Sequence, residues 1–262
     1  MKLHRPIGIF DAGIGSYAIV ERVRARFPDQ DVLYLADRAS FPYGAKTPTE
    51  LLACVQSATH YLQSEGCVAV VLASNAPSVV VLESLRAAVS MPVIGIFPPV
   101  REAIHRSRTR TIAVLGVRSM VTSDAMQSYA EQHRDAGSQV LLVNASALVD
   151  LVESFTFIRD PRMTQDLVTR FIADVRRSHP DVDVMTMSST HLPWLKSFFM
   201  SAAPDVLFVD PADTVLDELE PFTSNGRGLT RCIATETRDL TLDAFNQALQ
   251  ALGTPHRASL KN

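Results

Sequence analysis

The stretch Ile7-Gly8-Ile9-Phe10-Asp11-Ala12-Gly13-Ile14-Gly15-Ser16 contains the pattern that recurs along the whole chain. Its apolar run is followed directly by an acidic residue and a turn rich in small residues. Beyond the turn, Ile19, Val23 and Phe27 follow the spacing of an amphipathic helix. This order of strand, tight turn and helix indicates a parallel α/β sheet.

Similar apolar runs follow along the chain, separated by helical patterns. Most of the runs are continuous, which predicts strands that are buried on both faces of a parallel sheet. The fold class that we predict is therefore α/β with doubly wound parallel sheets. The predicted strands are Ile7–Phe10, Val32–Leu35, Val68–Leu72, Val93–Phe97, Thr111–Leu115, Val140–Val143, Val182–Met187, Val206–Val209 and Cys232–Thr235.

Helix signals lie between these strands. In Thr47-Pro48-Thr49-Glu50, a capping threonine, a proline in first position and a glutamate that closes a capping box predict a helix start. Apolar residues at spacings of three and four predict further helices over 78–89, 99–107, 123–134, 145–155, 163–178, 192–200, 211–220 and 242–252.

The pattern of elements occurs twice. Residues 7–13 and 112–117 each open a set of strands, and residues 68–75 and 182–189 each form an apolar strand that ends in small polar residues. The repeat predicts two similar domains, with the turn at 97–99 as the crossing point. Because ligands bind at the carboxyl ends of strands in such sheets, we expect the site in a cleft between the domains.

Composition excludes several classes of protein. The 262 residues are 47% hydrophobic and 20% charged, which favours a well-filled core over disorder. The net charge of −3 leaves no basic excess for nucleic acid. No apolar run approaches the roughly 20 residues of a membrane span, and the first residues do not resemble a signal peptide. We therefore expect a cytoplasmic protein without nucleic-acid or membrane partners.

The cysteines are few. Cys54, Cys67 and Cys232 form an odd, sparse set, which suits a reducing compartment and excludes a disulfide scaffold. None has a second cysteine or a histidine at metal-binding spacing, so we expect no metal site.

Polar residues after the first and third predicted strands are candidate site residues. Asp11 opens a turn that could bind a carboxylate or phosphate with Asp11 as an acid/base group, or it could simply cap the next helix. The turn lacks the third glycine of a dinucleotide fingerprint. Ser74 and Asn75 could likewise cap a helix, or Ser74 could point into the cleft while Asn75 donates to a substrate carboxylate.

Three further segments are candidates. His191, after Ser188-Ser189-Thr190, is a candidate general acid/base or a structural histidine, and the missing G-x-S-x-G motif argues against a serine hydrolase. Pro42-Tyr43-Gly44 is either a plain turn or a loop that offers backbone N–H groups and a phenol over the cleft. Glu153, in a helical stretch, is either a surface charge or a carboxylate that reaches the cleft.

Taken in order, these segments resemble the glutamate racemase family of the aspartate/glutamate racemase superfamily. The likeness runs from about residue 7 to 252. IGIFDAGIGS (7–16) resembles IG-[VI]-FDSG-x-GG, ADRASFPYG (36–44) resembles GD-x-x-x-x-PYG, and VVLASNAPS (70–78) resembles V-x-ACNTAS. MSSTHLPWL (187–195) resembles LGCTHYPLL, and LGVRSMVTS (115–123) falls where the family has IGT-x-x-TV-x-S.

The resemblance implies two α/β domains with pseudo-twofold symmetry, residues 1–97 with 211–262 and residues 98–210. It implies racemisation of a small amino acid without a cofactor, by one cysteine from each domain, and a chain able to form a homodimer. Asp11 and His191 would assist the two thiols, and Glu153 matches an acid of the family. Substrate contacts would fall on Ala12, Pro42, Tyr43, Gly44, Asn75, Ala76 and Thr190.

The chain departs from the family at the catalytic positions. Ser74 and Ser189 stand where the two cysteines belong, and alanines at 12 and 76 replace a serine and a threonine. Because a hydroxyl is a far weaker acid than a thiol, two-thiol racemisation is lost or strongly altered.

Three explanations stay open. The serines could be an engineered change in a racemase, although that would not require Ala12, Ala76 and Ser188. The chain could be a divergent member that binds or senses a small carboxylic or amino acid, one less polar than glutamate. It could also be an active isomerase, racemase or lyase that uses Asp11, His191 or Glu153 on another small acid.

Overall fold

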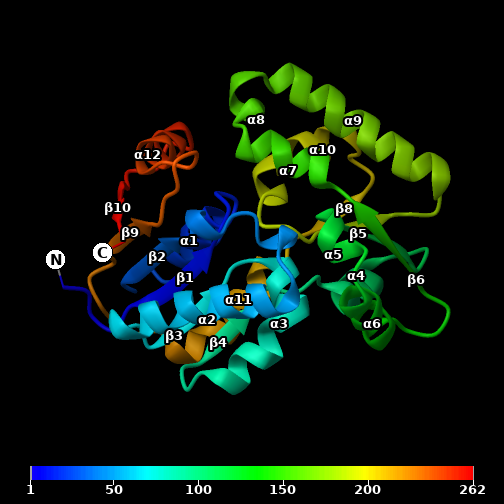
Figure 1. The fold of residues 1–262 in the computed structure, drawn as a ribbon. Coiled ribbons are helices and arrows are strands. Elements are labelled where there is room, and N and C mark those ends of the chain that lie inside the picture. The colour runs from blue at the N-terminus through cyan, green and yellow to red at the C-terminus, as the bar shows by residue number, and fades with distance from the viewer. Residues whose placement is uncertain (1, 262) are drawn as a thin grey trace. The chain divides into compact units, whose positions relative to one another are not determined.

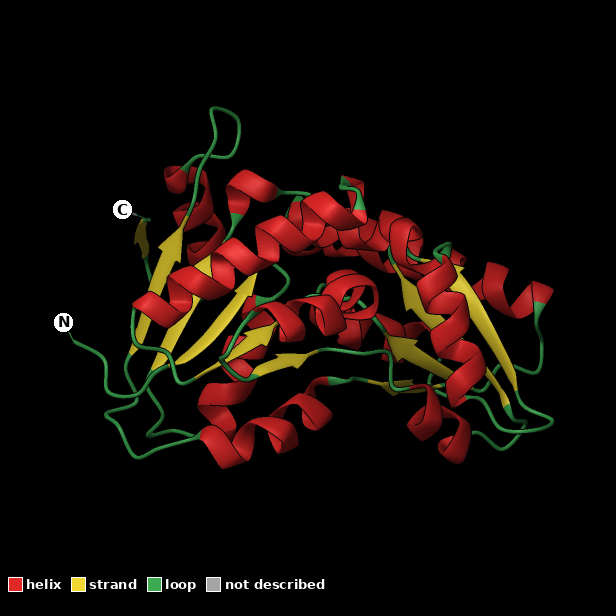
Figure 2. Cartoon of the chain, turned by 60° about the horizontal axis from the view of Figure 1, so that its bottom comes forward, coloured by secondary structure: helices red, strands yellow, loops and turns green. Residues whose placement is uncertain are grey.

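The computed structural model describes residues 2–261. They form two compact units, one made of the residues up to Ile96 together with those from Ala212 onward, the other of Phe97–Pro211. Each unit is built on a parallel sheet that is covered by helices (Figures 1 and 2). The predicted α/β class with two parallel-sheet domains is confirmed.

The first unit has a sheet with the strand order β10-β9-β2-β1-β3-β4, and all of its neighbouring strands are parallel. The strands are β1 (Ile7–Asp11), β2 (Val32–Ala36), β3 (Ala69–Leu72), β4 (Val93–Gly95), β9 (Thr230–Ala234) and β10 (Ala258–Leu260). Every residue of β1, β2 and β3 is buried, as their continuous apolar sequences require.

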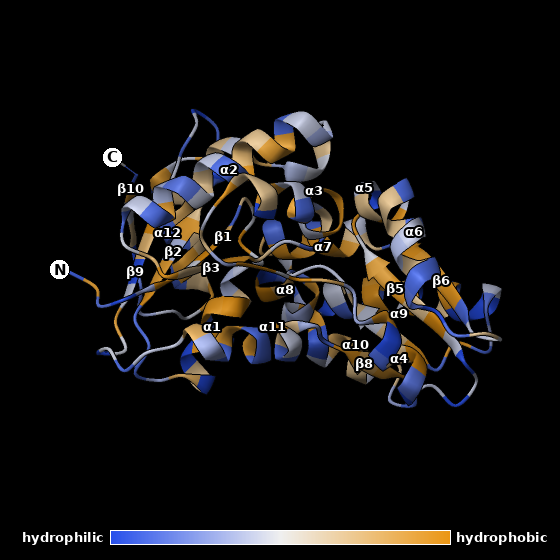
Figure 3. Ribbon diagram, turned by 90° about the horizontal axis from the view of Figure 1, so that it is seen from below, coloured by the Kyte–Doolittle hydropathy of each residue, from blue (hydrophilic) through white to orange (hydrophobic). Residues whose placement is uncertain are grey.

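Helices cover both faces of this sheet. The helices are α1 (Tyr17–Arg26), α2 (Pro48–Ser64), α3 (Asn75–Ala88), α11 (Ala212–Leu219) and α12 (Leu242–Ala251), with short 3₁₀ turns η1 (Arg38–Ser40), η2 (Tyr43–Ala45) and η4 (Glu220–Phe222). α2 packs on α3, and α1 packs on α11. Figure 3 shows these two pairs on opposite sides of the largely hydrophobic strands β1 and β3.

The second unit has a sheet with the order β6-β5-β7-β8, also parallel throughout. Its strands are β5 (Thr111–Gly116), β6 (Gln139–Asn144), β7 (Val184–Met187) and β8 (Leu207–Val209). Its helices are α4 (Val100–Arg106), α5 (Arg118–Val121), α6 (Asp124–His133), α7 (Ser146–Glu153), α8 (Thr156–Arg159), α9 (Pro161–Ser178), η3 (Leu192–Leu195) and α10 (Lys196–Ala202).

The two sheets share one topology. The order β2-β1-β3-β4 of the first unit matches β6-β5-β7-β8 of the second. Leu72 at the end of β3 is in register with Phe10 of β1, and Met187 at the end of β7 is in register with Leu115 of β5. The segments that the sequence pattern marked as similar therefore occupy equivalent places in their own sheets.

Most predicted elements are present, with differences at a few places. The capping box of Thr47 and Glu50 forms as predicted, and all nine predicted strands are found. The short strand β10 was not predicted, because its three residues form no apolar run. The predicted helix 145–155 is wrong at its end: α7 stops at Glu153, and Phe155 takes a left-handed conformation (φ 58°) before α8 begins.

A buried carboxylate fastens the C-terminal part of the chain to the first sheet. Asp31, which is fully buried just before β2, accepts hydrogen bonds from the backbone N–H groups of His4 (2.8 Å), Arg227 (2.9 Å) and Leu229 (2.9 Å). Burial opposes ionisation, but these bonds and the charge of Arg227 lower the pKa of Asp31 overall.

We predict that Asp31→Asn lowers the free energy of unfolding at neutral pH by about 1–3 kcal/mol, because the three N–H groups lose a charged acceptor. The folded pKa lies below the ordinary value of 3.8, so the contribution of Asp31 is present above that value and is lost as the pH falls through the folded pKa. Urea denaturation between pH 7 and pH 2 should show a weaker acid dependence for the variant than for the unaltered chain. Exposed Asp29→Asn is the control, and an equal loss in both variants would contradict the assignment.

Candidate functional site

Asp11 is the last residue of β1, and its side chain begins the predicted turn. Only 4% of the residue is exposed, and its carbonyl oxygen accepts a hydrogen bond from the N–H of Asp37 (2.8 Å). The N-cap of α1 is Ser16, so Asp11 does not occupy the capping position. The Ser16 hydroxyl instead contacts the carbonyl oxygen of Gly13 and the hydroxyl of Tyr34. These two contacts hold the turn in position.

Ser74 lies two residues beyond β3, at the N-cap of α3. Its side chain makes no capping hydrogen bond, so the simple capping explanation does not account for it. Its carbonyl oxygen accepts from both the N–H (3.1 Å) and the hydroxyl (2.7 Å) of Ser78. Ser78, rather than Ser74, therefore supplies the side chain that secures the start of this helix.

Asn75 is buried, and its two amide atoms have different surroundings. Its Nδ2 donates to the carbonyl oxygen of Ile96 (3.2 Å), whereas Oδ1 is buried without a hydrogen-bond partner. Since only the NH₂ group can donate to a carbonyl, this contact fixes the orientation of the amide. The sequence suggested Asn75 as a donor to a substrate carboxylate, but the unsatisfied atom is an acceptor.

The Pro42-Tyr43-Gly44 loop is held by a carboxylate that the sequence did not single out. Tyr43 donates to Asp37 (3.0 Å), and the hydroxyl of Thr235 donates to the other oxygen of Asp37 (3.1 Å). Burial, and then the charge of Asp37, raise the pKa of Tyr43 well above its ordinary value, so the phenol stays protonated. The phenol of Tyr43 thus helps to hold its own loop in position. Asp37 directly follows β2, just as Asp11 ends β1. This position at a strand end is the sequence signal that could have identified Asp37 as a candidate.

The side chain of Arg38 links this loop to the turn after β1. Its guanidinium donates to the carbonyl oxygen of Ala12 (2.8 Å) and lies over the rings of Phe41 and Phe245. The contact ties two of the predicted substrate-binding segments together within the first unit.

In the second unit, Ser189, His191 and Glu153 form one connected group. The hydroxyl of Ser189 lies 3.3 Å from Nδ1 of His191, and Nε2 of His191 lies 2.6 Å from Oε1 of Glu153. Ser189 and His191 are 6% and 7% exposed, and Thr190 between them is also buried. Glu153 ends α7, and η3, which begins beside His191, packs against this helix. Glu153 is therefore no plain surface charge.

The carboxylate sets the tautomer of the histidine. An ionised carboxylate can only accept, so the hydrogen bond to Glu153 places the imidazole proton on Nε2. In the neutral imidazole, Nδ1 then carries the lone pair and can accept from the hydroxyl of Ser189. The hydroxyl of Ser189, the imidazole of His191 and the carboxylate of Glu153 are thus joined one to the next by these two contacts.

Ala12, Ala76 and Ser188 stand where the family pattern has a serine, a threonine and a glycine, and the structure shows the surroundings of each. Ala12 is buried in the turn after β1, and Ala76 lies in the first turn of α3. Ser188 is fully buried, and its hydroxyl pairs with that of Thr186 (2.7 Å) instead of turning toward His191. Of the two adjacent serines, only Ser189 contacts the imidazole.

The three cysteines are unpaired, and none of them occupies the position two residues beyond β3 or β7 where Ser74 and Ser189 stand. Cys54 lies within α2, Cys67 precedes β3 and Cys232 lies in β9. Burial raises the pKa of both Cys67 and Cys232 to about 12. These two thiols therefore stay protonated at neutral pH and cannot act as thiolate bases.

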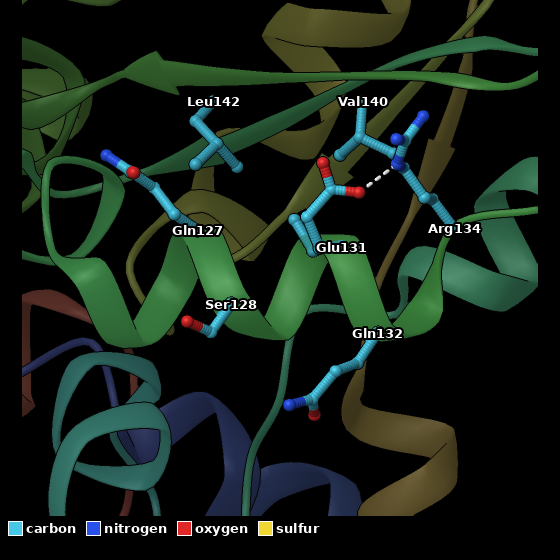
Figure 4. A pocket seen from close by; sticks show the side chains of 8 residues that line it. Gln127, Ser128, Glu131, Gln132, Arg134, Val140 and Leu142 are labelled. Atoms are coloured by element: carbon cyan, nitrogen blue, oxygen red, sulfur yellow. Dashed lines mark hydrogen bonds and ion pairs between the residues drawn. The ribbon is translucent and has the colours of Figure 1, made fainter.

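Within residues 2–261, no cluster of three or more His, Cys, Asp or Glu side chains could hold a metal, and no helix is long and apolar enough to cross a membrane. A pocket of about 650 Å³ lies between α6 and β6, and Figure 4 shows the side chains that line it. It is lined by Glu131, Arg134 and surface amides, and contains none of the predicted site residues.

With this geometry in place, comparison with known proteins identifies the class. The model of the Asp/Glu/Hydantoin racemase family matches residues 17–219, and the chain belongs to this family. The glutamate racemase of Haemophilus ducreyi is 31% identical over 216 residues, which cover 80% of this chain and 79% of that protein.

Solved structures of glutamate racemases have the same fold. An isoform from Bacillus anthracis is 22% identical with a TM-score of 0.84, covering 100% of this chain and 98% of that one. The enzyme from Thermus thermophilus, in complex with beta-chloro-D-alanine, is 25% identical with a TM-score of 0.80, covering 98% and 96%. The fold of the glutamate racemases thus extends over nearly all of this chain, while the family match covers residues 17–219.

We predict that Tyr43→Phe lowers the free energy of unfolding by about 1.5–3 kcal/mol, because a buried hydrogen bond to a carboxylate is lost. Thr235→Val removes the other hydroxyl from Asp37 and should have an effect of similar size. Because both bonds end on one carboxylate, the double variant should deviate from additivity, which urea denaturation of all four forms would measure. Strictly additive losses would contradict a shared role of Asp37.

Proposed function

We propose that this chain is a glutamate-racemase-like protein that binds a small carboxylic or amino acid, and that its thiol-based racemisation is lost or strongly altered. The observation that carries the proposal is the placement of Ser74 and Ser189. Each stands two residues beyond an equivalent strand end, β3 or β7, at a position where the resemblance puts a cysteine. A hydroxyl at these positions is a poor base for an α-proton.

The unsatisfied acceptor of Asn75 supports a ligand that carries an N–H donor. An unmade hydrogen bond at a buried atom costs free energy, and an ammonium or amide group would remove that cost. The Thermus thermophilus enzyme was solved with beta-chloro-D-alanine, which is an amino acid. A small amino acid is therefore the ligand class that we favour.

Four further features belong to the same proposal. We propose that the strand ends of the two units border a common cleft, as the sequence repeat predicts, and that Ala12, Pro42, Gly44, Ala76 and Thr190 line it. The chain would need no cofactor. It would work in the cytoplasm, which its sparse free cysteines favour, and it would form a homodimer like many members of the family.

A second candidate is an active isomerase, racemase or lyase on another small acid. The contact between His191 and Glu153 favours it, because a histidine oriented by a carboxylate is an effective general base. Asp11 would be the second acid/base group.

Ligand binding separates the proposal from an inert fold. We expect glutamate, aspartate or a less polar amino acid to stabilise the chain in thermal unfolding, by about 2.7 kcal/mol at one hundred times its Kd. Asn75→Ala should weaken this stabilisation, whereas Asn225→Ala, which changes an exposed loop amide, should leave it unchanged. Stabilisation by none of these acids would contradict the proposal.

α-Proton exchange in D₂O, followed by NMR, separates the two candidates. We expect no exchange on D- or L-glutamate by the unaltered chain. Exchange that His191→Ala or Asp11→Ala abolishes would overturn the binding-only form in favour of the second candidate.

Restoring both thiols tests the assignment of the serines. The variant Ser74→Cys/Ser189→Cys should gain α-proton exchange on the acid that stabilises the chain, because each thiol then has a far lower pKa than the hydroxyl it replaces. Each single variant should not racemise the acid, because one thiol can only remove and return the proton on one face, whereas inversion requires both bases. A folded double variant that binds this acid without exchanging its α-proton would contradict the assignment.

A further inference from the structure

We propose that Ser189 is a nucleophile for acyl transfer, activated by His191 and Glu153, and that it cleaves esters or amides of small carboxylic acids. All three residues belong to the second unit, and two contacts of 3.3 Å and 2.6 Å join them into one chain. This activity goes beyond binding and does not depend on it.

The group satisfies the requirements for an activated serine. A weak nucleophile needs a base within hydrogen-bond reach, and the base needs a third group that orients it. Nδ1 of His191 is the base, and the carboxylate of Glu153 holds the proton on Nε2 and would stabilise the imidazolium. Such a triad is defined by geometry and roles and recurs on unrelated folds, so the missing G-x-S-x-G motif does not exclude it.

The backbone holds these side chains in position. The N–H of Leu192 donates to the carbonyl oxygen of Ser189 (3.0 Å), and the N–H of Trp194 donates to that of His191 (3.1 Å). On the other side, the N–H of Ser188 donates to the carbonyl oxygen of Leu115 in β5 (2.9 Å). Both ends of the short segment are fixed, which preorganises the hydroxyl against the imidazole.

Acyl transfer also suits a hydroxyl better than α-proton removal does. As a base, Ser189 would have to exist as a free alkoxide, which its high pKa prevents. As a nucleophile it passes its proton to His191 while the new C–O bond forms, so no free alkoxide is required. The change from thiol to hydroxyl therefore favours acyl transfer over α-proton removal.

The proposed reaction balances with water as the second reactant. Oγ of Ser189 attacks the carbonyl carbon, its proton moves to Nδ1 of His191, and the bond to the leaving alcohol or amine breaks as His191 returns the proton to it. Water then attacks the acyl-serine and passes a proton to His191. The acid leaves as Ser189 takes that proton back, and no oxidant or reductant is needed.

The test uses the whole chain with p-nitrophenyl acetate and, separately, with an alkyl fluorophosphonate. Release of p-nitrophenol is followed by absorbance, and peptide mass spectrometry identifies the modified residue. We expect one acetyl or phosphonyl group per chain, on Ser189. Ser189→Ala should abolish this labelling, and His191→Gln should slow it by about 10²–10⁴-fold.

Two more variants separate a triad from a merely reactive serine. Glu153→Gln preserves size but removes the charge, so it should slow labelling while the folded circular dichroism spectrum is kept. Ser188→Ala changes the neighbouring hydroxyl, which contacts Thr186 rather than His191, and should leave the labelling rate unchanged.

Labelling of other serines or lysines at the same rate, or no labelling of a folded chain, would overturn the proposal. So would Ser189 labelling that His191→Gln does not slow. Thermal stabilisation by an amino acid, measured on the same samples, reports on the binding function separately.

Discussion

Burial of the parallel strands on both faces is the constraint on which the rest of the structure depends. A polar side chain on a strand between two helical layers needs a hydrogen-bond partner inside the protein, as Thr186 in β7 has in Ser188, because it has lost its water contacts there. Polar groups are therefore concentrated at the last residue of each strand or just beyond it. Asp11, Ser74 and Ser189 all occupy such places, and the fold thereby concentrates functional groups at the carboxyl ends of the strands.

This constraint explains how much could be predicted from the sequence. Continuous apolar runs marked nine of the strands, and the polar residues that follow them marked the candidate site. Contacts between distant segments could not be predicted in this way: Thr235 carries no local signal, yet it shares Asp37 with Tyr43. The orientation of the Asn75 amide likewise depends on the carbonyl oxygen of Ile96, which any residue type would supply.

Glu153 shows how a local irregularity creates a site residue. In the predicted helix 145–155, Glu153 lies inside the helix, and the apolar spacing alone gives it no special position. Because α7 ends at Glu153 and Phe155 turns the chain, the carboxylate reaches His191 from the last turn of the helix. Sequence patterns locate helices better than their ends, and here the end carries the chemistry.

The discontinuous first unit has a consequence for how the chain is made. β2 has β9 as its outer neighbour, and residues 230–234 leave the ribosome long after β1, β2 and β3. Until then the nascent sheet has an open, apolar edge at β2, and Asp31 lacks two of its three N–H donors. The residues of the second unit, up to Pro211, are made during this interval, whereas the edge of the first sheet stays open to aberrant strand pairing until residues 230–234 have been made.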